Sequence, residues 1–190
     1  MRLLTILTLA LMLGGSVWAG DVPRPAAPLT MKTVDGQQVS LDDLKGKVVA
    51  VMFFSTTCPH CQQTTQLLNP IYSQWKSRGL EILGFALNPE ATAGLPAFKQ
   101  QYNVQFPLGL VTRSEFTRFA EISVMARFYV PYMMFVDRNG VIREEHPGGD
   151  KPFYENQDAN LKASLDRLLS EPIGKRSTSA RPVGKTVASK

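Results

Sequence analysis

The sequence has few of the residues that build metal centres and cross-links. Its 190 residues include two cysteines, Cys58 and Cys61, and two histidines, His60 and His146. A structural zinc site takes four ligands, mostly cysteine and histidine, and three of these four residues are crowded into one short motif. We therefore expect no metal site. Because no further cysteine is present to form a structural disulfide elsewhere, the hydrophobic core must hold the fold.

The sequence also lacks a hydrophobic run long enough to cross a bilayer comfortably. The N-terminal run from Leu3 to Leu13 follows the cation Arg2 and precedes a small-x-small cleavage pattern at residues 17–19. This is typical of a secretory signal peptide over residues 1–19. No cysteine follows it, so a lipid anchor is not indicated. We expect a periplasmic protein that contacts the membrane only if the signal peptide is left uncleaved.

A basic face is missing as well, although the net charge is +5. Residues 171–190 hold five basic side chains and one acidic one, whereas residues 20–170 carry 15 of each. A nucleic-acid-binding domain needs a clustered basic surface, so no nucleic-acid partner is expected. The tail is rich in Ser, Thr, Pro, Gly and Lys without apolar periodicity, which predicts a basic disordered segment at 171–190.

The informative motif is Cys58-Pro59-His60-Cys61. It follows the apolar run 48–54, which predicts a buried strand, and it opens a helical pattern that extends to about residue 77. Two residues between cysteines in the first turn of a helix bring the sulfurs within bonding range. Cys-x-x-Cys at a strand-to-helix junction indicates a thiol-disulfide redox motif.

The position of each motif residue suggests its role. Cys58 stands at the helix N-terminus, where unpaired N–H groups and the helix dipole favour the thiolate, so it is the expected nucleophile. Pro59 suits the first helical position, and His60 adds a ring that can be cationic near the sulfur. Cys61, one turn in and expected to be more buried, would resolve the mixed disulfide.

The sequence disfavours two other uses of this motif. A structural disulfide at this spacing closes a very short loop and would stabilise the fold little. A covalently attached haem needs histidine directly after the second cysteine, and Gln62 stands there. No cofactor is expected.

The remaining patterns place further elements around the motif. Asp35-Gly36 predicts the turn of an N-terminal hairpin within residues 29–40, and Asn139-Gly140 predicts a second hairpin after the apolar run 126–136. The other predicted segments are a proline-rich linker at 20–28, a strand at 80–87, a helix at 90–102 interrupted near Gly94 and Pro96, an extended piece at 104–110, a short helix at 115–121 capped by Ser114, and a helix at 153–170.

Residues 29–170 resemble the thioredoxin-like superfamily. The resemblance rests on the segment Phe53 to Cys61 together with Val130-Pro131 and the strand and Asn-Gly turn that follow. The N-terminal hairpin and the helical insertion before Val104 are similar to the TlpA/ResA branch of exported thiol-disulfide oxidoreductases. The resemblance implies an α/β thioredoxin-like domain with a central mixed sheet flanked by helices and an N-terminal hairpin extension.

The resemblance also implies a substrate-binding element. In this family the proline matching Pro131 is cis and packs beside the cysteine pair. Val130 would then present its backbone to an extended substrate chain crossing Cys58. The expected partners are protein thiol or disulfide substrates and an unidentified redox partner protein.

Two positions depart from the reductases of this family. Where a proton-shuttling carboxylate often stands, this sequence has Met52, six residues before Cys58, and Thr64, six residues after it. Neither side chain can shuttle a proton, and Pro59-His60 resembles the active site of DsbA-type oxidants. These features favour an oxidising or exchange role.

Two further functions are weaker alternatives. A Sco-like copper chaperone would need a distant histidine, for which His146 is the candidate, but such proteins space their cysteines by three residues. A peroxiredoxin-type peroxidase needs Pro-x-x-x-Thr-x-x-Cys, and Val51 and Ser55 occupy the Pro and Thr positions.

Overall fold

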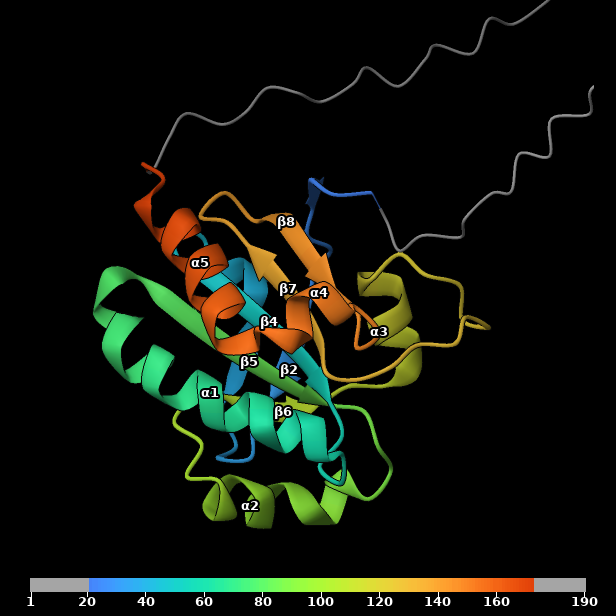
Figure 1. Ribbon diagram of the computed structural model, residues 1–190. Coiled ribbons are helices and arrows are strands. Elements are labelled where there is room, and N and C mark those ends of the chain that lie inside the picture. The colour runs from blue at the N-terminus through green and yellow to red at the C-terminus, as the bar shows by residue number, and fades with distance from the viewer. Residues whose placement is uncertain (1–20, 173–190) are drawn as a thin grey trace, which may run out of the picture.

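The computed structural model describes residues 21–172, which form one mixed sheet, a separate hairpin and helices on both sheet faces (Figure 1). The predicted signal peptide and all but the first two residues of the predicted tail lie outside this range. The strands are β1 (Arg24–Pro25), β2 (Thr30–Lys32), β3 (Gln38–Ser40), β4 (Val48–Phe54), β5 (Leu80–Ala86), β6 (Leu108–Leu110), β7 (Tyr132–Val136) and β8 (Val141–His146). The helices are η1 (Leu41–Leu44), α1 (Pro59–Trp75), η2 (Lys76–Arg78), α2 (Ala91–Gln101), α3 (Arg113–Phe119), α4 (Lys151–Glu155) and α5 (Gln157–Ser170).

The main sheet has the strand order β1-β8-β7-β4-β5-β6. Strand β4 pairs parallel with β5 and antiparallel with β7, so the sheet is mixed. The four central strands β4, β5, β7 and β8 include three that are buried along their whole length. A strand buried on both faces is expected to be continuously apolar, which explains the run Val48 to Phe54.

Alternate residues of these strands enter two hydrophobic clusters, one on each face of the sheet. Met52, Phe54 and Phe135 pack with α1, α2, α4 and α5. Phe53 and Met134 belong to the other cluster, which includes α3, the β2–β3 hairpin and residues before it. Both faces of the sheet are thus covered by other elements. The cysteine motif lies at the edge of the sheet, where β4 ends and the chain turns into α1.

The N-terminal hairpin is confirmed as a two-stranded sheet of its own. Its turn holds Gly36 at a φ of 82°, a conformation that suits glycine. The hairpin joins the main sheet through an antiparallel bridge between Thr33 and Gly109. A Cβ at Gly109 would lie 2.8 Å from the Lys32 carbonyl oxygen, so the close approach depends on glycine.

The segment predicted as a proline-rich linker contributes to the main sheet. Arg24 and Pro25 form β1 and pair with Ile142 and Val141 of β8. Arg24 is buried, and its guanidinium forms an ion pair of 2.7 Å with Glu145. This long-range pair holds the segment against the domain.

Two predicted helix boundaries near the C-terminal half were wrong. Ser114 does not cap the short helix, because Thr112 accepts a hydrogen bond from the Glu115 N–H and the Glu115 carboxylate accepts one from the Thr112 N–H. This capping box satisfies two N–H groups at once. The single helix predicted at 153–170 is two helices, α4 and α5, which meet at the non-helical residue Asn156.

One other helix also differs from its prediction. Helix α2 is continuous through Gly94 and Pro96, and the carbonyl that Pro96 cannot bond belongs to the exposed residue Thr92. Strand β7 begins at Tyr132, directly after Val130-Pro131, as the resemblance implied. Within residues 21–172, no helix combines the length and hydrophobicity that a bilayer crossing requires.

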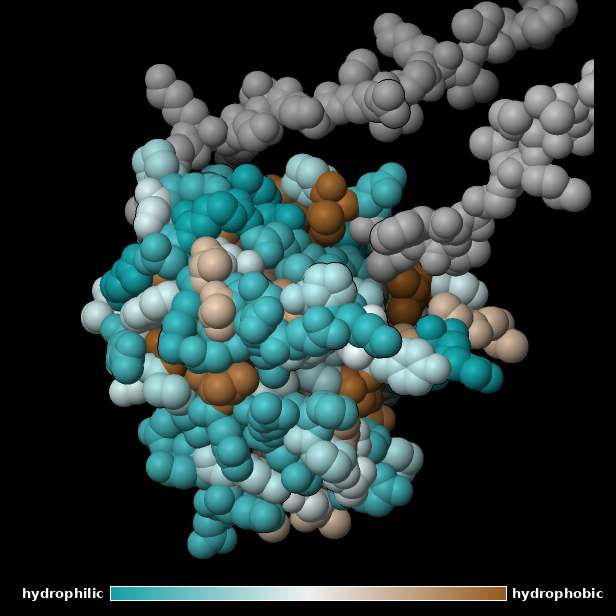
Figure 2. All heavy atoms as spheres, viewed as in Figure 1, coloured by the Kyte–Doolittle hydropathy of each residue, from teal (hydrophilic) through white to brown (hydrophobic). Residues whose placement is uncertain are grey.

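The surface is mainly hydrophilic on the face seen in Figure 2, with hydrophobic side chains in small separate patches. Among the large hydrophobic side chains of residues 21–172, Met125 is the most exposed at 88%, followed by Tyr129 at 61% and Val124 at 59%. All three belong to the segment between α3 and β7. This concentration marks that segment as different from the rest of the described surface.

Candidate active site

Cys58 lies at the carboxyl end of β4, where the chain turns into α1. It is the N-cap residue of α1, in extended conformation, and Pro59 is the first helical residue. The Asn88 side chain stabilises the turn that precedes Cys58. It accepts a hydrogen bond from the Thr56 N–H at 3.0 Å and donates one to the Thr56 hydroxyl at 2.9 Å. Cys58 is half-buried, so its sulfur can meet a reactant while the helix N-terminus faces it.

Cys61 is the buried partner of this pair, as the sequence predicted. It lies one turn along α1 with 0% exposure, and both cysteines are free thiols. Burial raises the pKa of the Cys61 thiol well above its ordinary value of 9.0, and the hydrogen bond and charge of Cys58 act in the same direction. Cys61 therefore keeps its proton until the chemistry at Cys58 changes its surroundings.

The predicted cis peptide bond between Val130 and Pro131 is present. Pro131 is buried, and the Val130 carbonyl oxygen lies 3.7 Å from Cys58 Sγ, within range of an S–H···O hydrogen bond. Residues 72 positions apart are thus brought together at the end of α1. The contact agrees with the expected place of Val130 beside the cysteine pair.

Pro59 and His60 are both exposed beside Cys58. The His60 carbonyl accepts a hydrogen bond from the Thr64 hydroxyl at 2.8 Å, which is a contact within α1. The ring points to no partner among the described residues. Its predicted action on the Cys58 thiolate stays a prediction.

The neighbourhood of Cys61 contains two residues that sequence reasoning missed. Gln157, at the start of α5, is buried and donates a hydrogen bond of 2.8 Å to the Thr64 hydroxyl. Tyr154, in α4, packs against the same hydrophobic cluster as Cys61 and bonds the Pro131 carbonyl at 2.6 Å. Both come from the C-terminal segment, and no local motif marked them.

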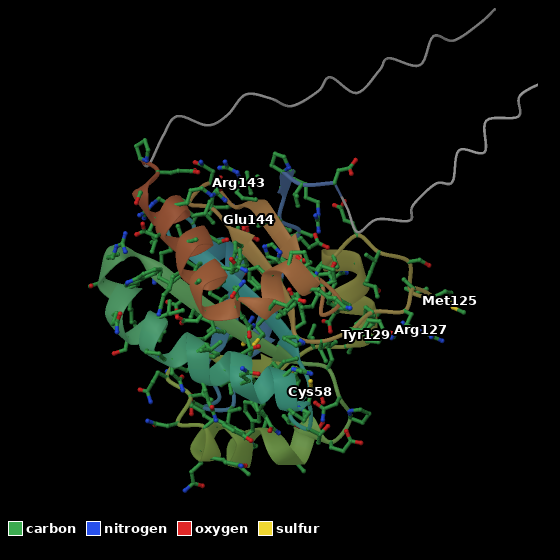
Figure 3. All side chains as sticks on the ribbon, viewed as in Figure 1. Cys58, Met125, Arg127, Tyr129, Arg143 and Glu144 are labelled. Carbon is green, nitrogen blue, oxygen red and sulfur yellow. The ribbon has the colours of Figure 1, made fainter. Side chains whose placement is uncertain are left out.

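His146 forms a cluster of its own at the end of β8. Its ring stacks on Phe153 at 3.8 Å, Nδ1 lies 2.7 Å from Asp150 and Nε2 lies 3.2 Å from Glu144. Glu144 lies well away from Cys58 in Figure 3. Burial opposes ionisation of Glu144, but hydrogen bonds from His146, Ser164 and Arg167 prevail and lower its pKa to about 2.

Both ring nitrogens of His146 are therefore occupied by carboxylates. No group of three or more potential metal ligands is found within the described range 21–172. This arrangement gives the copper-chaperone alternative no support.

The segment before Pro131 forms a braced rim beside Cys58. Arg113 donates hydrogen bonds to the Val124 carbonyl at 3.2 Å and to the Ala126 carbonyl at 2.8 Å, and its guanidinium lies over the Phe128 ring. The neighbouring Val130 carbonyl lies 3.7 Å from Cys58 Sγ. Figure 3 shows Tyr129, Arg127 and Met125 along this loop, with Met125 the farthest of them from Cys58 in this view. The rim thus presents apolar and cationic side chains on a fixed backbone.

Comparison with known proteins identifies the family. The profile of the AhpC/TSA family matches residues 22–145, which is most of the described chain. The chain belongs to the AhpC/TSA family. Both the cysteine motif and the Val130-Pro131 bond lie inside the matched residues.

Relatives of this AhpC/TSA protein include two kinds of named protein. It is 24% identical over 128 residues to the thiol-disulfide oxidoreductase ResA of Bacillus thuringiensis subsp. konkukian, covering 67% of this chain and 70% of that protein. It is 33% identical over 89 residues to a putative peroxiredoxin bcp of Coxiella burnetii, covering 46% of this chain and 58% of that protein.

Solved structures confirm the fold of this AhpC/TSA protein. A putative protein disulfide isomerase from Bacteroides thetaiotaomicron matches with a TM-score of 0.65 and 25% identity, over 80% of this chain and 94% of that one. The domain therefore has the thioredoxin-like α/β fold, with a central mixed sheet flanked by helices, that the sequence resemblance implied.

Proposed function

We propose that this protein is an exported thiol-disulfide oxidoreductase that exchanges disulfides with protein substrates through Cys58 and Cys61. The observation that carries the proposal is the pairing of a half-exposed Cys58 at the N-terminus of α1 with a buried Cys61 one turn away, beside the Val130 carbonyl. The name and the 70% coverage of the ResA relative support the same chemistry.

The exchange proceeds in two balanced steps. The Cys58 thiolate attacks one sulfur of a substrate disulfide, the substrate S–S bond breaks, and the departing thiolate takes a proton from solvent. The Cys61 thiol then gives up its proton to solvent and attacks Cys58 Sγ. This forms the Cys58–Cys61 disulfide and releases the second substrate thiolate, so the substrate gains two electrons and the protein loses two. The reverse sequence oxidises a substrate dithiol.

A substrate segment would lie in extended form across Cys58, with its backbone alongside Val130. The exposed side chains of Tyr129 and Met125 and the cation Arg127 would lie next to that segment. An unfolded or flexible partner chain with apolar residues near its cysteine fits this rim best. A separate redox partner protein would return Cys58 and Cys61 to their starting state.

The central experiment uses two variants of the full chain. Cys61→Ser cannot resolve, so it should accumulate a mixed disulfide at Cys58 with a cysteine-containing peptide disulfide, which mass spectrometry detects. Cys58→Ser should form none. The proposal fails if the Cys61→Ser variant forms no adduct or if the Cys58→Ser variant forms as much.

The direction of electron flow is decided by the reduction potential of the couple, measured against glutathione buffers. Related couples span roughly −270 to −120 mV. Met52 and Thr64 occupy the two positions where the resemblance implies a carboxylate in reductases, and the Thr64 hydroxyl accepts a hydrogen bond from the neutral Gln157 amide. We expect a value toward the oxidising end, and a value near the reducing end would reassign the protein as a reductase.

The periplasmic location rests on the sequence pattern of residues 1–19. Sequencing the N-terminus of protein recovered from the periplasm should give Gly20 as the first residue. Recovery of the chain from the membrane with Met1 or Leu3 still attached would instead support a tethered form.

A thiol peroxidase is the second candidate, because of the family match and the Coxiella relative. In that reaction the Cys58 thiolate would attack a peroxide oxygen to give a sulfenic acid and water or an alcohol, and Cys61 would condense with it to release water. Val51 and Ser55 stand where such enzymes have Pro and Thr. We expect hydrogen peroxide to oxidise the reduced protein more slowly than a peptide disulfide does. The opposite order would favour the peroxidase.

A further inference from the structure

Three consecutive carbonyls on the loop before β7 contact different parts of the chain. The Val130 carbonyl faces Cys58 Sγ. The carbonyls on either side of it are bonded to the segment that follows β8: Tyr129 O accepts a hydrogen bond from the Gly148 N–H at 3.2 Å, and Pro131 O accepts one from the Tyr154 hydroxyl at 2.6 Å. The direction of the Val130 carbonyl is thus fixed by its two neighbours.

The Tyr154 hydroxyl continues the β7–β8 ladder by one step. The last paired residues of the ladder are Met133 and His146. Beyond them, the Tyr154 hydroxyl lies 2.6 Å from Pro131 O and 3.0 Å from His146 O. Pro131 has no N–H, and the β7–β8 ladder ends at His146. The Tyr154 hydroxyl therefore acts as the hydrogen-bond donor there in place of a backbone N–H.

The element that carries Tyr154 is itself fixed. Asp150 caps α4, accepting a hydrogen bond from the Phe153 N–H, and Asp150 Oδ2 lies 2.7 Å from His146 Nδ1. The loop from Pro147 to Asp150 approaches Tyr129 so closely that a Cβ at Gly148 would lie 2.8 Å from the Tyr129 carbonyl carbon. Backbone atoms cannot move aside as a flexible side chain can, so this contact requires glycine.

We infer that Tyr154 is a positioning residue for the exchange reaction. Its hydroxyl donates a hydrogen bond to the Pro131 carbonyl and so directs the Val130 carbonyl to the side of Cys58 where a substrate backbone would lie. The inference rests on the function proposed above. It assigns to α4 a part in the reaction, although the hydroxyl of Tyr154 bonds neither Cys58 nor Cys61. Gly148 is the second support of the same three-residue segment.

The test separates substrates that use the Val130 backbone from those that do not. A peptide disulfide can pair with Val130, whereas hydroxyethyl disulfide has no backbone and reaches only the sulfur. In Tyr154→Phe the ring and its packing on Phe153 remain, but Pro131 O loses its donor. We expect the rate with the peptide to fall about tenfold, the effect of losing one hydrogen bond, while the rate with hydroxyethyl disulfide stays within about twofold.

Matched controls exist for both supports. Tyr102→Phe removes a hydroxyl that accepts one hydrogen bond from Gln101 at the end of α2, away from the site, and should leave both rates unchanged. Gly148→Ala should lower the peptide rate as Tyr154→Phe does, whereas Gly149→Ala should not, because a Cβ at Gly149 would meet nothing within 4 Å.

The outcomes distinguish this inference from the proposed function. If the wild-type protein exchanges with neither disulfide, the proposed function fails and the inference with it. If the wild type exchanges but Tyr154→Phe keeps the wild-type ratio of the two rates, only the inference fails. If Tyr154→Phe does not fold, the ratio is read from Gly148→Ala against Gly149→Ala, and equal ratios in those two variants overturn the inference.

Discussion

Two buried polar clusters lie on opposite faces of the sheet, and they differ in charge. On the face covered by α3, Arg24 pairs with Glu145 at 2.7 Å, and the Tyr132 hydroxyl donates to the same carboxylate. On the face covered by α1, Gln157 donates to Thr64 beside Cys61. The first cluster is ionic and holds the N-terminal segment. The second is neutral and lies one turn along α1 from Cys61.

The difference shows where a buried charge is tolerated. A buried carboxylate is stable only when charged and hydrogen-bonded partners surround it, as Arg24 and Tyr132 surround Glu145. A charged side chain buried near Cys61 would act on the thiol through a medium of low dielectric and would change the pKa of the thiol directly. The neutral pair of Thr64 and Gln157 satisfies the polar groups without that effect.

Breaking the ionic cluster should have the largest effect on stability. Arg24→Met would leave the Glu145 carboxylate, whose side chain is 5% exposed, without its cation. Loss of one partner of a buried pair costs about 3–5 kcal/mol, so we expect the free energy of unfolding in urea to fall by that amount.

Two controls test whether this loss comes from the stranded charge. Arg24→Met combined with Glu145→Gln should recover a large part of the stability, because no buried charge remains. Lys162→Met removes one partner of an exposed ion pair with Asp158 and should change stability by less than about 1 kcal/mol. If Arg24→Met behaves like Lys162→Met, the ionic cluster does not hold the segment.

Breaking the neutral cluster should have a smaller effect. Thr64→Val keeps the shape of the side chain but removes the acceptor of the Gln157 amide, which is buried. An unsatisfied buried donor costs about 1–3 kcal/mol, and urea unfolding measures it. Thr65→Val is the matched control, since the Thr65 hydroxyl donates only to the Cys61 carbonyl within α1. Equal losses in both variants would show that Gln157 is not dependent on Thr64.

These clusters also show which parts of the molecule could be predicted from the sequence. Cys58, Cys61 and the surrounding strand and helix were predictable because the apolar run, the cysteine spacing and Pro59 are all local signals. Val130 and Pro131 were placed through the family resemblance, and the structure has the cis bond and the contact with Cys58.

The missed residues share one property, which is a partner far along the chain. Arg24 bonds Glu145, 121 positions later, and Gln157 bonds Thr64 at a separation of 93. A proline-rich context predicts a linker at Arg24, and nothing local distinguishes Gln157 from a solvent-facing helix residue. Ser114 is a different case, because the Thr-x-x-Glu pattern beginning at Thr112 was visible and specifies the cap.

The buried thiol should make the stability of the reduced protein depend on alkaline pH. Burial raises the pKa of Cys61 in the folded chain above 9.0, so the unfolded chain releases this proton first. The contribution is complete below pH 9 and is lost as pH rises above it, by up to about 1.4 kcal/mol per pH unit. Urea unfolding under reducing conditions between pH 8 and pH 10 measures the slope.

Cys61→Ala is the control for that slope. It removes the titrating group while Cys58 and the tyrosines remain, so its free energy of unfolding should fall less steeply over the same range. Identical slopes in the two proteins would mean that the folded state does not disfavour the Cys61 thiolate.

The smallest effect is expected at His60, where a charge would act on Cys58 from the solvent side instead of from within. The ring is exposed, and interactions between exposed charges are weakened by water and salt. His60→Ala should therefore lower the rate of Cys58 alkylation by iodoacetamide at pH 7 by less than about threefold, and the difference should disappear at high salt. A loss of tenfold or more that persists at high salt would show that His60 contacts the reacting sulfur directly.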